Sequence, residues 1–171
     1  MTLDERIELL KHDIDLNPHE IGWLIDNGFF TAPASTKYHG NYEGGLFDHS
    51  YMVLRNLEAL TIKMGLQWQR PQSPYIIGMF HDLCKMDSYI NENGIYKFNT
   101  NTLLKGHGDK SVMLLASKIT LTEEEVMCIR YHMGAFTDKE EWNDYTNAIK
   151  KYPNVLWTHH ADMMASHIDG V

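Results

Sequence analysis

Residues 78–87, GMFHDLCKMD, place an aspartate directly after a histidine at the end of an apolar run. The run starts at Ser73-Pro74 and continues through YIIGMF, which predicts a buried helix with proline in its first turn. A buried carboxylate is costly unless a cation or a hydrogen-bond donor satisfies it. His81 and Asp82 are therefore either a mutually satisfied polar pair in a core or the centre of an active site.

Helix signals continue on both sides of this stretch. Thr2 with Glu5 and Thr122 with Glu125 have the spacing of capping boxes, and Asn17 precedes a proline at a helix start. The longest predicted helix covers about residues 45–64 and follows the glycine-rich loop TAPASTKYHGNYEGG. Later helices are predicted from Thr122 to about His132, from Asp138 to about Lys151, and from about Pro153 through NVLWTHHADMMASHI.

One segment has a different pattern. Residues 88–99, SYINENGIYKFN, alternate apolar and polar side chains around Asn93-Gly94, a pair typical of a two-residue hairpin turn. No internal repeat, low-complexity tract or long linker interrupts the chain. We therefore expect one domain over residues 1–171, all-α with one small β-hairpin. Its core would cover about residues 35–168, with the helices of residues 1–34 packed on it.

Composition narrows the class of protein. Hydrophobic residues make up 43% of the chain and charged residues 22%, which is typical of a soluble globular domain, and no apolar stretch is long enough to span a bilayer. The net charge of −8 disfavours non-specific binding to nucleic acid. Cys84 and Cys128 are the only cysteines, so we expect a reducing, cytoplasmic compartment and no membrane partner.

Six side chains are candidate metal ligands because each lies at a helix end or beside an apolar stripe: His49, His81, Asp82, His107, His132 and Asp162. Neutral imidazoles and carboxylates gathered from several helices bind divalent transition metals. Taken singly, however, a histidine is more often a surface residue or a hydrogen-bonded core residue. Spacing alone therefore leaves the metal site open.

The order of these residues resembles that of the HD-domain metal-dependent phosphohydrolases, over about residues 35–168. Residues 35–50, STKYHGNYEGGLFDHS, are similar to the segment HH-x-x-x-GGL-x-x-H of HD domains related to YhaM-type 3′–5′ exoribonucleases and small phage or prophage proteins. The resemblance implies an HD-domain helical bundle. It also implies one metal ion held by His49, His81, Asp82 and Asp162, and a second held by His107 and His132 with Asp82 bridging.

The resemblance extends to residues beside the expected ligands. Lys85, in HDLCK, matches the lysine that commonly follows the pair as HDxGK, and the resemblance implies that it contacts a phosphate; Cys84 replaces the usual glycine. His159 and His160 precede Asp162 and fit a supporting or structural role.

The loop before the longest helix has two interpretations. Either His39 or Lys37 contacts a substrate phosphate while Gly44 and Gly45 let the backbone approach it, or the glycines only set the helix start. Glu43 is a weaker candidate as an acidic ligand.

We therefore expect hydrolysis of a phosphate ester by metal-activated water, with Asp82 and Lys85 as catalytic residues and one or two ions of Mn, Fe, Co, Ni or Zn. A small phosphorylated substrate, first of all a nucleotide, suits the acidic chain. The alternative is a 3′–5′ nuclease on single-stranded nucleic acid, with stacking or phosphate contacts from Trp68, Arg70, Tyr89 and Tyr96. Two further alternatives are a non-catalytic nucleotide- or metal-binding module and an oxygenase with paired iron.

Overall fold

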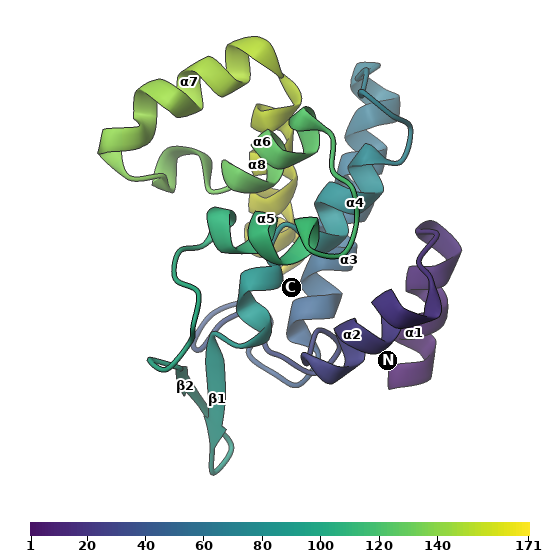
Figure 1. Ribbon diagram of the computed structural model, residues 1–171, viewed down its shortest axis with the longest axis vertical. Coiled ribbons are helices and arrows are strands. Elements are labelled where there is room, and N and C mark those ends of the chain that lie inside the picture. Colours follow the sequence, from purple (N-terminus) through teal and green to yellow (C-terminus); the bar gives the residue numbers. More distant parts are fainter.

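The computed structural model describes residues 1–171 and contains eight α-helices and one two-stranded antiparallel sheet (Figure 1). In chain order the elements are α1 (Leu3–Asp13), α2 (Pro18–Asp26), α3 (Gly45–Met64), α4 (Ser73–Phe80), β1 (Tyr89–Glu92), β2 (Ile95–Phe98), α5 (Gly108–Ala116), α6 (Glu123–Arg130), α7 (Trp142–Lys151) and α8 (Asn154–Met164). The mostly helical architecture with one hairpin confirms the predicted class. No helix combines the length and apolar character needed to cross a bilayer.

Local signals account for most helix boundaries. The capping boxes at Thr2 and Thr122 both form, and α3 ends as predicted at Gly65, whose φ of +64° is left-handed. Asp138 is predicted to cap the next helix, but its side chain makes no cap hydrogen bond. A 3-10 turn over Lys139–Glu141 comes first, and α7 begins at Trp142, whose indole N–H donates to the carbonyl of Thr137.

The prediction for the last helix also needs a correction at its end. Helix α8 ends at Met164, and the chain continues as one π-helical turn over Ala165–Asp169. The hairpin pairs Tyr89 with Phe98 and turns at Asn93-Gly94, as expected, and it projects away from the helices (Figure 1).

Helix α3 forms the middle of the fold and packs against both α4 and α8, while α6 packs against α4, α5 and α8. The closest approach is at Gly78 of α4, where an added Cβ would lie only 2.4 Å from the Cα atom of Leu54 on α3. Glycine at this position therefore sets the spacing between the helix that carries His49 and the helix that leads into His81.

Residues 1–34 pack on the start of α3. Arg6 of α1 is 7% exposed, and its guanidinium makes two 3.2 Å hydrogen bonds to the carboxylate of Asp48 and one to the carbonyl of Phe30. Farther along, Asp13 pairs with Arg55 at 2.9 Å. Because bidentate arginine–carboxylate pairs fix geometry, α1 anchors the turn of α3 that carries the next residue, His49.

The acidic run at residues 123–125 does more than start α6. Glu125 is fully buried and accepts hydrogen bonds from Arg70 at 2.7 Å and from the hydroxyl of Ser73 at 2.8 Å. Glu124 is 4% exposed and accepts from the side-chain amide of Asn154 at 2.9 Å. Acidic residues at a helix start are favoured by the helix dipole, and here two of these carboxylates also tie α6 to α4 and α8.

Candidate metal centre

Five separate segments bring the six candidate ligands together. His49 lies in the first turns of α3, and Asp162 lies in α8. His107 directly precedes α5, and His132 follows α6. Helix α4 ends at Phe80, so Asp82 leaves the helical path with φ −106° and ψ 21°. This break lets the adjacent His81 and Asp82 side chains turn toward one point, which residues one apart in a helix cannot do.

One oxygen of Asp82 faces two imidazoles. Its Oδ2 atom lies 3.4 Å from Nε2 of His81 and 3.6 Å from Nε2 of His49. The same His49 nitrogen lies 3.2 Å from Oδ1 of Asp162. These three residues thus surround Asp82 with ligand-type atoms from α3, α4 and α8.

The other oxygen of Asp82 faces a second pair of imidazoles. Its Oδ1 atom lies 2.9 Å from Nε2 of His107 and 3.5 Å from Nε2 of His132. Asp82 therefore stands between two groups of histidines, one at each carboxylate oxygen, and a carboxylate in this position can be shared between two ions.

The hydrogen bonds of three imidazoles determine their tautomers. Their Nδ1 atoms lie within hydrogen-bond distance of main-chain oxygens, which only accept, so each Nδ1 carries a proton and, in the neutral imidazole, each Nε2 carries a lone pair. The three pairs are His49 with Val171 at 2.9 Å, His81 with Gly78 at 2.9 Å, and His132 with Ile129 at 2.7 Å. Ligand histidines in metal sites are oriented in the same way.

The lone pairs of these nitrogens have no proton to accept. Nε2 of His49, His81 and His132 and Oδ1 of Asp82 are buried and have no hydrogen-bond partner. Buried polar atoms in proteins are nearly always satisfied, and lone pairs that face a carboxylate repel it. A divalent cation removes both problems at once, and the ligand-type atoms lie within 4.8 Å of one another in each of three groups. These buried residues could therefore hold a metal ion.

The ionisation of Asp82 and of His81 also suits metal binding. Burial opposes ionisation of Asp82, but the ammonium of Lys85, 2.6 Å away, outweighs it and holds the carboxyl pKa well below its usual range. Burial lowers the pKa of His81. Anionic carboxylates and a neutral imidazole are the forms that bind metals.

A cavity of about 270 Å³ opens beside the cluster. Besides the cluster residues, its wall includes Ser35, His39, Tyr89, Phe136, His159 and Met163. Lys85 lines the cavity with a side chain that is 12% exposed. Burial lowers the pKa of His39 to about 4, so His39 is neutral at neutral pH. The cavity thus presents one ammonium, the carboxylates of Asp82 and Asp162, and neutral polar groups to a ligand.

Some predicted residues lie outside the cavity. Lys37 and Glu43 are exposed, and neither lines it. His160 is also exposed, and its Nδ1 atom bonds to the carbonyl of Leu156 in its own helix. Within the loop before α3, His39 alone of the predicted polar side chains reaches the cavity.

The glycine pair in the same loop has a packing explanation. A Cβ at Gly44 would lie 2.3 Å from the guanidinium of Arg6, and a Cβ at Gly45 would lie 2.0 Å from the carbonyl oxygen of Gly40. Of the two interpretations left open by the sequence, these contacts favour the one in which the glycines set the start of α3.

Two further residues support the site. The sequence predicted a supporting or structural role for His159, and it marked Cys84 only as a replacement for glycine. His159 lines the cavity, its Nδ1–H donates to the carbonyl of His132 at 2.9 Å, and its ring packs on Gly134. Its position three residues before Asp162 was the available signal. Cys84 places its sulfur 3.1 Å from Nδ1 of His107, and burial raises the pKa of its thiol to about 12. The replacement of glycine in HDLCK was the signal there.

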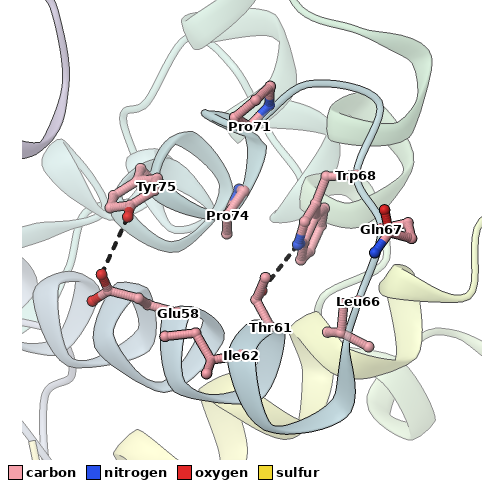
Figure 2. Close-up of a pocket in the computed structure, with 9 residues that line it drawn as sticks. All are labelled: Glu58, Thr61, Ile62, Leu66, Gln67, Trp68, Pro71, Pro74 and Tyr75. Carbon is pink, nitrogen blue, oxygen red and sulfur yellow. Dashed lines mark hydrogen bonds between the residues drawn. The ribbon is translucent and has the colours of Figure 1, made fainter.

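The residues expected to stack on nucleic acid do not gather at the cavity. Figure 2 shows Trp68 in a separate hollow of about 330 Å³ between α3 and the start of α4, where its indole N–H donates to the hydroxyl of Thr61. Arg70 pairs with Glu125, and Tyr96 lies in the hairpin outside the cavity wall. Of these four residues, only Tyr89 lines the cavity.

The centre therefore consists of histidines and carboxylates from five segments, with one lysine beside them and a small cavity in front. Comparison with known proteins assigns it to no family. The chain matches no protein-family model, no curated protein and no solved structure.

Proposed function

We propose that this protein is a metal-dependent phosphohydrolase of the HD-domain type that cleaves the phosphate ester of a small substrate, first of all a nucleotide. One observation carries the proposal. The Nε2 atoms of His49, His81 and His132 are buried around Asp82, and none of them has a hydrogen-bond partner. The ammonium of Lys85, at the edge of the same cluster, supports a phosphate as the group to be bound.

The ligands divide into two sets that share Asp82. His49, His81, Asp82 and Asp162 would hold the first ion, and Asp82, His107 and His132 would hold the second. The shared carboxylate supports this division, because its two oxygens face different pairs of imidazoles. Mixed imidazole and carboxylate sites accept Mn, Fe, Co, Ni or Zn.

A bound divalent ion supplies Lewis-acid chemistry, because it acidifies water and neutralises charge on the phosphoryl oxygens. Lys85 binds a non-bridging oxygen of the phosphate, and Asp82 holds the lysine in place through the 2.6 Å ion pair. His39, neutral and half-buried in the wall of the cavity, offers a hydrogen bond to the same group. The apolar side chains of Phe136 and Met163 line the part of the cavity that would receive the rest of the substrate.

The size and charge of the cavity support a compact substrate. Small-molecule sites span roughly 300–1,000 Å³, and this cavity, at about 270 Å³, lies just below that range. One lysine and no arginine line it, which suits a single phosphate group. Nucleic-acid cleavage has less support, because Trp68 and Arg70 make their contacts elsewhere. The two buried free cysteines fit a reducing compartment, so we place the protein in the cytoplasm, with phage or prophage origin as a part of this proposal.

The test combines elemental analysis with a turnover screen. Metal-depleted protein is reloaded with each of the five ions and assayed against nucleoside monophosphates and labelled single-stranded oligonucleotides. His81→Ala and Asp82→Ala should lose bound metal and turnover together, whereas His160→Ala, a matched change at an exposed histidine, should keep both. Full turnover by the metal-depleted protein contradicts the proposal. Ion binding without turnover of any substrate identifies a binding module, and turnover of oligonucleotides alone identifies a nuclease.

A further inference from the structure

His107 differs from the other imidazoles of the centre in the group that orients it. The Nδ1–H groups of His49, His81 and His132 donate to main-chain oxygens at 2.7–2.9 Å. Nδ1 of His107 instead lies 3.1 Å from the sulfur of Cys84. Because a thiol sulfur is a weaker hydrogen-bond acceptor than a carbonyl oxygen, the tautomer and the orientation of His107 are held least firmly.

Burial distinguishes the same histidine. The side chain of His107 is 36% exposed, whereas those of His49 and His81 are fully buried. Cys84, in contrast, is 1% exposed, and its backbone N–H donates to the hydroxyl of Ser111 at 3.0 Å. The thiol is therefore a fixed point in the interior, and it is the one protein group that hydrogen-bonds to the second nitrogen of a half-exposed imidazole.

We propose that Cys84 is a positioning residue that sets the affinity of the second ion, bound by Asp82, His107 and His132, without affecting the first. The sulfur contacts Nδ1 of His107 and not Nε2, the nitrogen that faces Asp82, so the thiol acts through the imidazole. This inference rests on the proposed two-ion centre. Partners of the second nitrogen of ligand histidines change metal affinity by about 10–100-fold.

The consequence is a centre with two unequal ions. The first ion has ligands whose imidazoles are oriented by strong oxygen acceptors and sealed from solvent. The second ion depends on a half-exposed histidine with a weak sulfur partner, so it exchanges more readily. Replacement of the sulfur should change the second affinity alone, which separates a positioning role from a general loss of packing.

Calorimetric titration of the metal-depleted full chain with Mn²⁺ tests this. The wild-type protein should bind two ions in two resolved steps, and His107→Ala should retain only the tighter step. Cys84→Ala should raise the Kd of the weaker step about tenfold and leave the tighter step unchanged. Cys84→Ser, which keeps a hydrogen-bonding group of similar size, should recover most of the affinity.

The matched control is Cys128→Ala, at the other buried free cysteine, which hydrogen-bonds to no histidine and should leave both steps unchanged. Far-UV circular dichroism of each variant verifies the fold. Equal weakening of both steps in Cys84→Ala, an unchanged second step, or a single step in the wild-type protein overturns the inference. A wild-type protein that binds no ion defeats the proposed function as well. Two unequal ions without phosphoester turnover defeat the proposed function alone.

Discussion

The spacing between α3 and α4 can be tested with one methyl group. In Gly78→Ala, the new Cβ would lie 2.4 Å from the Cα atom and 2.6 Å from the nitrogen of Leu54. Ordinary van der Waals contact begins at 3.4 Å, so the helices must separate by about 1 Å or distort locally. Both close atoms belong to the backbone, which cannot rotate away as a side chain can.

Two effects should follow from this displacement. Overpacking of a tight core costs about 1–3 kcal/mol, so the midpoint of urea unfolding should fall by about 1 M. The same shift moves His81 relative to His49, whose ring centroids are 5.4 Å apart. Because metal–ligand distances are fixed to within about 0.2 Å, the affinity for the first ion should fall together with the stability.

The matched control is Gly22→Ala on α2, where no atom lies within 4 Å of the added Cβ. This change should stabilise the protein by about 0.5–1 kcal/mol, because alanine is more favourable than glycine in a helix interior. Urea unfolding and calorimetric titration of both variants give the comparison. A Gly78→Ala protein with wild-type stability and wild-type metal affinity would refute the argument that glycine at the helix crossing sets the geometry of the centre.

Three further changes test other parts of the structure. Gly134→Ala would place a Cβ 2.3 Å from the ring of His159 at a φ of +56°, so we expect turnover to fall several-fold with metal content retained, as measured by steady-state kinetics and elemental analysis. Glu125→Ala removes the ion-pair partner of Arg70 and the acceptor of the buried Ser73 hydroxyl, and should cost about 1–3 kcal/mol in chemical denaturation, without direct loss of a ligand. Removal of metal by chelation should lower the melting temperature. An ion added at 100 times its Kd should raise the free energy of unfolding by about 2.7 kcal/mol. An unchanged melting temperature would argue against a bound ion.

The accuracy of the sequence-based predictions depends on whether the signal is local. Thr2 and Gly65 act on residues three or four positions away, and both helix ends were predicted correctly. The start of α7 was not: Asp138 makes no side-chain cap hydrogen bond, a 3-10 turn comes first, and the indole N–H of Trp142 donates to the carbonyl of Thr137. Helix starts that depend on such contacts leave no clear pattern in the sequence.

The same distinction holds for the candidate centre. Residue types and their order pointed to His49 and Asp82, but only the packing of α3 on α4 and α8 brings their side chains together. Lys37 and His39 lie two residues apart in an irregular loop, where no periodicity indicates which side chain faces inward. The buried role of Glu125 was missed because its partner Arg70 is 55 residues away.

The structure also indicates how the centre forms. Each buried ligand atom without a hydrogen-bond partner lowers the free energy of unfolding by about 1–3 kcal/mol. The ligand cluster therefore opposes folding in the absence of an ion. Contacts outside the cluster offset this cost: Arg6 holds Asp48 beside His49, and Glu125 ties α6 to the start of α4. In the proposed metal centre the scaffold therefore places the ligands in advance, and an ion would remove the lone-pair repulsion without assembling the fold. We infer that the metal-free protein stays folded but less stable, unlike small zinc domains that unfold without metal.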